Sequence, residues 1–124
     1  MRIFLMTIVL CGCAATPPDS READALSREL GERVAGEPRS CIAGTQSQGL
    51  TVSDRQTIVS RQGDTIWVNR LESDCPGLRP FSTLIVEANG SQYCRGDRVR
   101  AVEAGSSIPG PWCVLRDFTP YRRR

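Results

Sequence analysis

The sequence predicts a mainly β fold: a small antiparallel β-barrel or sandwich, stabilised by two disulfides and preceded by one N-terminal α-helix. From residue 39 onward, short runs of β-branched and aromatic residues alternate with turn residues. Four of the six cysteines lie in the same segment, and a helical apolar stripe precedes it. Since about 100–200 residues make one domain, a chain of 124 residues fits one small β domain with an N-terminal extension.

Residues 1–12 have the pattern of a signal peptide. A positive start, Met1-Arg2, precedes an apolar run over residues 3–10 that is too short to span a membrane. Leu10-Cys11-Gly12-Cys13 follows and resembles the lipobox of bacterial lipoproteins. The resemblance implies cleavage before Cys13, lipidation of Cys13 and attachment to the membrane through that lipid anchor.

The residue after Cys13 bears on the final location of the chain. By resemblance to enteric sorting, Ala14 favours an outer-membrane lipoprotein of the cell envelope that faces the periplasm. The alternative is an ordinary signal peptide cleaved near Ala14-Ala15, which would give a secreted or soluble periplasmic protein.

Residues 13–38 are predicted to hold the lipidated cysteine, a spacer and a tether helix. Two prolines stiffen the spacer, and Asp19 with Glu22 gives a carboxylate version of the capping box that starts a helix. Glu29 and Arg33 form an expected i,i+4 ion pair on this helix. Its apolar stripe consists of Ala23, Leu26, Leu30 and Val34, with Gly31 inside the helix and Gly36 and Pro38 at its end.

The predicted disulfide-linked β domain covers residues 39–120. Its strand candidates are residues 40–43, 50–52, 56–60, 65–71, 82–88, 91–94, 98–103 and 112–115. Asn89-Gly90 is a strong hairpin signal because both positions accept positive φ, and it predicts that Val86 lies opposite Tyr93. Trp67 is in mid-strand and points away from its neighbours Ile66 and Val68. If both faces of that strand are covered, a closed barrel is favoured over an open sheet.

The domain keeps four cysteines once Cys11 leaves with the signal peptide and Cys13 carries the lipid. In a small exported domain they predict two disulfides, with three possible connectivities. We select Cys75–Cys94, which would close the segment around the Asn-Gly turn, and Cys41–Cys113, which would tie the first strand to the last. A zinc site is the alternative, but the cysteines lack C-x2-C spacing and an oxidising compartment disfavours free thiolates.

Composition restricts the chemistry of the chain. All sixteen basic residues are arginine, and the sequence contains neither lysine nor histidine. The commonest general base and metal ligand is therefore missing, and Schiff-base chemistry is excluded. A formal net charge of +2 is too small to indicate a nucleic-acid partner. We expect no catalytic residue, no metal, no cofactor and no nucleic-acid partner.

Short motifs around the cysteines form a frame over residues 39–120. They are Asn69-Arg70-Leu71, Cys75-Pro76-Gly77-Leu78, Tyr93-Cys94-Arg95-Gly96-Asp97, Pro109 before Cys113, and Phe118-Thr119-Pro120. This frame resembles a family of small exported proteobacterial lipoproteins, a domain of unknown function whose members often carry a lipobox. The resemblance implies an envelope location and paired cysteines. It supplies no activity and no catalytic residue.

Two sets of residues are candidates for binding. Four aromatic residues could form a ligand pocket or a binding face, although core positions are also expected for them. They are Trp67, Trp112, Tyr93 and Phe81. Residues 121–124 are predicted to be a basic C-terminal tail. Its Arg122, Arg123 and Arg124 could contact anionic lipid or lipopolysaccharide phosphates, and the alternative is a solvated end.

Three functional hypotheses follow. The leading one is a non-enzymatic binding or accessory module that acts on an envelope protein or glycan. The alternative is a periplasmic inhibitor of a hydrolase such as a lysozyme or protease, by analogy of form with other small lipid-anchored barrels. The third is a glycan hydrolase, which needs two carboxylates about 5–10 Å apart in a cleft. Its candidate acids are Asp54, Asp64, Glu87, Asp97, Glu103 and Asp117.

Overall fold

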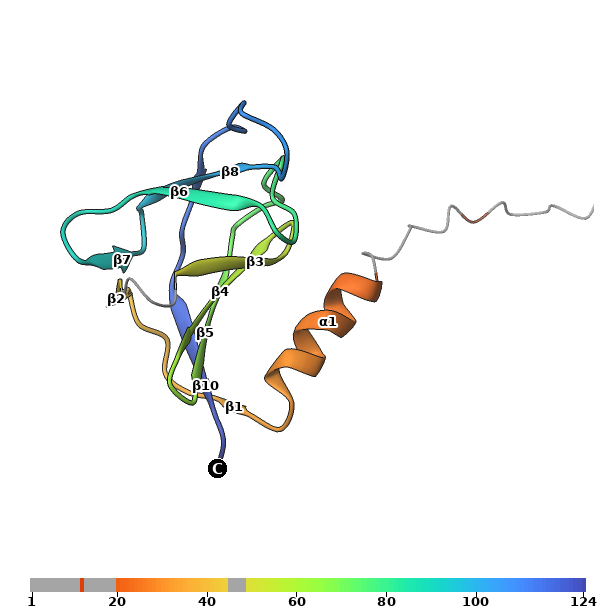
Figure 1. Ribbon diagram of the computed structural model, residues 1–124. Coiled ribbons are helices and arrows are strands. Elements are labelled where there is room, and N and C mark those ends of the chain that lie inside the picture. Colours follow the sequence, from red (N-terminus) through yellow and green to blue (C-terminus); the bar gives the residue numbers. More distant parts are fainter. Residues whose placement is uncertain (1–11, 13–19, 45–48) are drawn as a thin grey trace, which may run out of the picture.

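The computed structural model describes residue 12, residues 20–44 and residues 49–124. It confirms a mainly β fold, with three antiparallel sheets and one short helix (Figure 1). The sheets pack in a sandwich-like arrangement and do not close into a barrel. The predicted lipidation site Cys13 and nearly all of the predicted signal peptide lie outside the described residues.

The largest sheet has five strands in the order β1-β10-β5-β4-β3. Their bounds are Val34–Ala35 for β1, Phe118–Arg122 for β10, Thr65–Arg70 for β5, Thr57–Gln62 for β4 and Leu50–Asp54 for β3. β10 pairs with β5, so that the end of the chain lies between the N-terminal β1 and the middle of the domain. The predicted boundary of the C-terminal tail at residue 121 therefore falls inside a strand. Arg122 lies opposite Val34, and its Nε donates to the hydroxyl of Thr65 at 3.1 Å.

Two smaller sheets complete the β structure. One has the order β6-β8-β9, with bounds Thr83–Glu87, Arg98–Val102 and Cys113–Val114. The other pairs β2, Cys41–Ala43, with β7, Gln92–Cys94.

The predicted Asn-Gly hairpin is wrong in its strand pairing. Gly90 does adopt a positive φ of 78°. The strands on either side of this turn nevertheless diverge: Val86 lies opposite Val99 on β8, and Tyr93 lies opposite Ile42 on β2. The β6–β8 pair is five residues long, and the inward side chains of β8 are buried in the core. The burial gained when β6 pairs with β8 therefore outweighs the preference of Asn89-Gly90 for a local hairpin.

The disulfides join Cys41 to Cys94 and Cys75 to Cys113. All four predicted cysteines take part, but both predicted pairs are wrong. The β2–β7 pairing places Cys41 directly opposite Cys94, with their Cα atoms 4.0 Å apart. Cys75 and Cys113 lie 6.1 Å apart at Cα, within the range that a disulfide spans. The Cys41–Cys94 link follows from the β2–β7 pairing. The predicted Cys75–Cys94 pair assumed the hairpin that does not form, and the predicted Cys41–Cys113 pair assumed a link from the first strand to the last.

Helix α1, Ser20–Leu30, is shorter than the stripe predicted from the sequence. It ends at Gly31, whose φ of 56° lies in the left-handed region that glycine adopts without a Cβ clash. Gly31 therefore terminates the helix and does not lie within it. Val34, predicted to be helical, belongs to β1.

The helix packs on the five-stranded sheet and is part of the domain, not a separate tether. Leu26 is buried with Val59 of β4 and with Ile66 and Val68 of β5. Figure 1 shows α1 on one side of this sheet and the two smaller sheets across its other face and upper end. Both faces of β5 are therefore covered. The sequence associated such coverage with a closed barrel, but in the structure α1 covers the second face.

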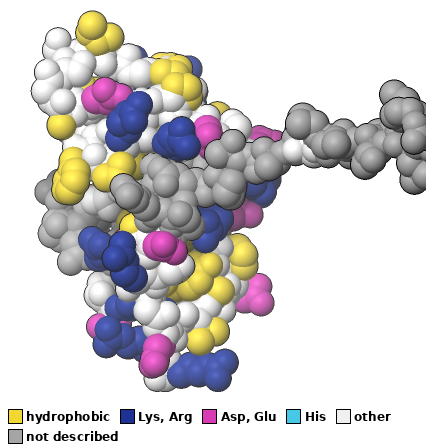
Figure 2. Space-filling view, turned by 90° about the vertical axis from the view of Figure 1, so that its right-hand side faces the viewer, with side chains coloured by type: hydrophobic (Ala, Val, Ile, Leu, Met, Phe, Trp, Pro, Cys, Tyr) yellow, Lys and Arg dark blue, Asp and Glu magenta, His cyan; other side chains and the backbone are white. Residues whose placement is uncertain are grey.

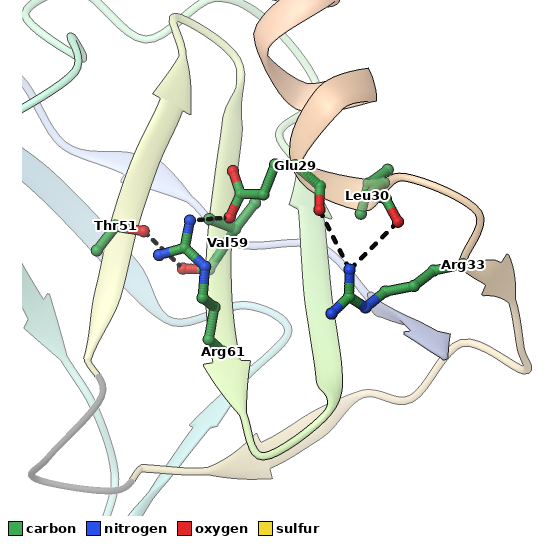
Figure 3. A network of polar contacts seen from close by, with 6 residues as sticks. All are labelled: Glu29, Leu30, Arg33, Thr51, Val59 and Arg61. Carbon is green, nitrogen blue, oxygen red and sulfur yellow. Dashed lines mark hydrogen bonds and ion pairs between the residues drawn. The ribbon is translucent and has the colours of Figure 1, made fainter. Parts of the chain in front are cut away.

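Polar contacts hold the helix in place (Figure 3). The carboxylate of Glu29 pairs with Arg61 on β4, so the predicted Glu29–Arg33 ion pair does not form. Arg33 instead donates to the backbone carbonyls of Glu29 and Leu30, both at 3.3 Å, and these belong to the last turn of the helix. On the sheet beside them, the Thr51 hydroxyl donates to the carbonyl of Val59 at 3.4 Å. The arginines thus satisfy helix-terminal carbonyls and link the helix to β4.

The main core lies on the other face of the five-stranded sheet. Its buried members are Ile42, Ile58, Trp67, Leu71, Cys75, Leu78, Val99, Ala101, Leu115 and Phe118. They come from all three sheets, from the segment between β5 and β6 and from the segment between β9 and β10, so one apolar cluster joins the three sheets.

A buried asparagine connects β5 to the segment before β10. The Nδ2 of Asn69 donates to the carbonyl of Arg116 at 2.7 Å, and its Oδ1 accepts from the Arg116 N–H at 3.0 Å. Asn69→Ala should lower the free energy of unfolding by about 2–3 kcal/mol, because two backbone groups would lose their partner in a buried site. Urea unfolding followed by tryptophan fluorescence measures this, and a loss below about 0.5 kcal/mol would contradict the role.

Candidate binding site at the apical loops

Trp112 lies beside the outer face of the β6-β8-β9 sheet, together with two arginines. Arg98 and Arg100 alternate along β8 with the buried Val99 and Ala101, so both arginines point outward. The guanidinium of Arg100 lies 4.3 Å from the centroid of the Trp112 ring, and that of Arg98 lies 5.0 Å from it. Both are within cation–π range, and the half-buried Trp112 is held between its own loop and β8.

A groove of about 410 Å³ lies next to Trp112. One wall is formed by residues 71–74 and 76 and the other by residues 111–114, and the Cys75–Cys113 disulfide joins the two segments. Pro76, Pro111 and Val114 give the groove an apolar lining. Glu72 and Asp74 add two carboxylates, and neither takes part in the ion pairs within the described part of the chain. The groove thus offers apolar contact together with hydrogen-bond acceptors.

The segment before β6 presents an uncovered aromatic side chain. Phe81 is 93% exposed, and its φ of 71° is rare for a bulky residue. The surrounding backbone is well held: the Ser82 N–H donates to the Arg79 carbonyl at 3.0 Å, and the Ser82 hydroxyl donates to the Gly77 carbonyl at 3.2 Å. Leu78 in the same loop is fully buried. The loop is anchored on both sides of Phe81 while the ring itself has no cover.

A second loop, residues 103–111, lies against the first. Its Ile108 is 78% exposed, and Glu103 accepts from Arg79 Nε at 3.0 Å. A Cβ on Gly110 would lie 3.0 Å from the Pro76 carbonyl oxygen, so glycine permits this close approach of the two backbones. We call the area around Phe81, Ile108 and Trp112, with the adjoining groove, the apical surface. Figure 2 shows one face of the molecule, on which exposed apolar side chains and charges of both signs are interspersed.

The four aromatic candidates divide into two pairs. Phe81 and Trp112 belong to the apical surface. Trp67 is buried in the main core, with the guanidinium carbons of Arg39 and Arg122 at 5.8 and 5.7 Å from its ring centroid. Tyr93 is half-buried and packs against the same core.

Sequence reasoning did not identify Ile108 or the paired arginines of β8. The alternation of Arg98 and Arg100 with apolar residues was a usable signal for an exposed basic row. No sequence pattern indicated that Ile108 is exposed, because a single isoleucine is more often buried.

The predicted C-terminal arginines are not equivalent. Arg122 is a strand residue, whereas Arg123 and Arg124 follow the strand and line a groove with Glu32 and Val34. Their proposed contact with anionic lipid stays a prediction.

The six candidate acids of the glycan-hydrolase hypothesis have separate surroundings. Glu87 pairs with Arg98, Glu103 with Arg79, and Asp117 with Arg95. Asp54 and Asp97 accept from the nearby backbone N–H groups of Gln56 and Cys94, and Asp64 lies in the β4–β5 turn. Asp117 also lines a groove together with Arg70 and Arg116. No observation favours a catalytic pair among the six acids.

Two further features bear on the class of protein. Within the described residues, no group of three or more histidine, cysteine, aspartate or glutamate side chains could hold a metal ion. In the same part of the chain, no helix has the length and apolar character needed to cross a membrane.

These observations define the class of protein: a small, disulfide-linked, sandwich-like β domain with a docked N-terminal helix and an exposed apolar loop surface. The chain belongs to DUF6491, a family of unknown function, whose model matches residues 1–122. The match includes the N-terminal segment and α1 as well as the four-cysteine frame. Neither the curated proteins nor the solved structures include a match to the chain.

Proposed function

We propose that this chain is a non-enzymatic binding module of the proteobacterial cell envelope that binds a partner protein through its apical surface. In this proposal a lipid on Cys13 holds the mature chain at the periplasmic side of the outer membrane. Two disulfides support an oxidising compartment. The observation that carries the binding role is Phe81, a large aromatic side chain left uncovered on a well-held loop.

The chemistry of the apical surface favours a protein over a glycan or small molecule as the partner. Aromatic and arginine side chains dominate the energetic centres of protein interfaces, and Phe81, Trp112 and Arg100 are of these types. Phe81 and Ile108 project from the domain, so they suit insertion into a pocket of the partner better than enclosure of a small ligand. The strained φ of Phe81 supports the same role, because unusual backbone conformations concentrate at functional sites.

Site-specific photo-crosslinking in cells tests the proposal. A photoreactive residue at position 81 or 108 should give the same discrete protein adduct, whereas one at the exposed position 37 should give none. Phe81→Ala should then weaken binding of the identified partner about 30-fold, the effect of losing about 2 kcal/mol at an interface centre. Adducts with glycan alone, or none from either position, would overturn the proposal.

The strained backbone conformation of Phe81 leads to a separate prediction about stability. Phe81→Gly should leave the free energy of unfolding unchanged or raise it by up to about 1 kcal/mol, because glycine accepts a positive φ while the lost ring had no packing. Thermal and urea unfolding of the variant and the parent protein measure this. A loss of about 2 kcal/mol would show that the ring has a structural role and would remove the reason to treat it as a binding residue.

A hydrolase inhibitor is the second candidate, and the same loop supports it. A well-held loop with a projecting aromatic side chain has a shape that can enter the cleft of an enzyme. The mature protein should then inhibit a lysozyme or protease at micromolar concentration, and Phe81→Ala should weaken that inhibition. Absence of inhibition across a broad hydrolase panel would remove this candidate and leave the binding-module proposal standing.

A further inference from the structure

Another groove lies on the face of the five-stranded sheet that α1 partly covers. The helix packs over Val59, Ile66 and Val68, and beside it a groove of about 290 Å³ extends over β5 and β10. Its lining residues are Pro38, Val68, Arg70, Arg116, Asp117, Thr119 and Tyr121. This groove shares no residue with the apical surface.

Among the described residues, two arginines in this groove have no acidic partner. Arg70 ends β5 and Arg116 precedes β10, and neither guanidinium belongs to an ion pair in the part of the chain that the structure describes. The groove also contains Asp117, but Arg95 Nη1 lies 3.0 Å from the Asp117 carboxylate and compensates its charge. The groove therefore keeps an excess of positive charge.

The backbone holds this site in a defined geometry. Asn69, which is fully buried, binds both the N–H and the carbonyl of Arg116 and directly precedes Arg70 in β5. Thr119 and Tyr121 lie on β10 opposite Val68 and Ile66, so their hydroxyls come from the strand next to Arg70. Arg70 and Arg116, together with Thr119 and Tyr121, thus line one groove from two paired strands and the segment before β10.

We infer that this groove is a binding site for a phosphoryl oxyanion, with Arg70 and Arg116 as its charged donors and Thr119 and Tyr121 as neutral donors. Guanidinium groups match the oxygens of phosphate with two parallel hydrogen bonds each, and hydroxyls can satisfy the remaining oxygens. Arg123 and Arg124 lack this setting, because the groove that they line contains Glu32 and no hydroxyl side chain. The phosphoryl group comes from a phospholipid headgroup or from free phosphate, and the inference does not depend on the proposed protein partner.

Binding to the mature protein in detergent tests this inference. Two probes are titrated by calorimetry: inorganic phosphate and a short-chain, monomeric phosphatidylglycerol. At least one should bind saturably, and Arg70→Gln/Arg116→Gln should weaken it at least tenfold. Thr119→Val, which removes a hydroxyl without changing charge, should weaken it about threefold or more. The matched control Arg123→Gln/Arg124→Gln removes the same net charge and should bind within twofold of the parent protein.

Each outcome decides a part of the inference. Binding of the lipid alone assigns the site to a headgroup, and binding of inorganic phosphate alone assigns it to free phosphate. Saturable binding of neither probe overturns the site, as does an equal loss in the Arg123/Arg124 control, which would show diffuse charge attraction. Unfolding midpoints of all variants, measured in the same buffer, show whether a loss of binding reflects a loss of fold.

Discussion

Replacing Cys75 and Cys113 together by alanine is expected to lower the free energy of unfolding by about 4 kcal/mol. The disulfide joins residues 38 positions apart, and removing a link of this span restores about that much chain entropy to the unfolded state. Cys75 is also buried in the main core, so the variant loses apolar contacts there as well. Urea unfolding of the oxidised protein, followed by tryptophan fluorescence, measures the change. Small domains have only about 5–15 kcal/mol of stability, so this loss would remove a large part of it.

The second disulfide supplies a matched control. Cys41→Ala/Cys94→Ala removes a link of 53 positions, with a similar entropic loss, but from two half-buried cysteines outside the main core. The Cys75/Cys113 variant should therefore be at least as unstable as this control. A change below about 1 kcal/mol in both would contradict the stabilising role of the disulfides.

Single variants test the connectivity itself. In Cys41→Ala the one free thiol of the β domain should be Cys94, identified by alkylation and peptide mapping. A free thiol on Cys113 would instead support the pairing that the sequence suggested. The Cys75–Cys113 link also joins the two walls of the apical groove, so its loss should weaken partner binding more than loss of Cys41–Cys94 does.

Phe118→Ala is expected to cost about 3–5 kcal/mol of unfolding free energy. Phe118 has no exposed surface and belongs to the main core, so the truncated side chain leaves a cavity. Its backbone exchanges two hydrogen bonds of 2.8 Å with Arg39, and these survive the substitution, which makes the loss a packing effect. Urea and thermal unfolding measure it.

Two comparisons make the Phe118 prediction specific. Phe118→Leu keeps most of the apolar volume and should cost less than about 1.5 kcal/mol. Phe81→Ala removes the same ring from an exposed position and should change stability by less than about 0.5 kcal/mol. Equal effects of the two alanine substitutions would contradict the division between a core aromatic and a binding aromatic.

The candidate surfaces were only partly accessible to sequence reasoning. Phe81 and Trp67 are both aromatic residues in β-rich surroundings, yet one projects into solvent and the other lies in the core. Residue type alone cannot separate them, because exposure depends on which distant segments cover each side chain. The same holds for Arg70 and Arg116, which are separated by 46 positions and share a groove only because β10 returns beside β5.

Sequence patterns were sufficient to predict the β class, the N-terminal helix, most strand positions and the participation of four cysteines in disulfides. These are local properties, since periodicity, β-branched content and turn residues act over a few neighbouring positions. The three-dimensional structure was needed to show that β6 pairs with β8, that β7 pairs with β2, and hence that Cys41 is bonded to Cys94. The same structure shows that α1 covers the second face of β5. Pairing depends on how much apolar surface distant segments bury together, and a turn signal such as Asn89-Gly90 contributes less than that burial.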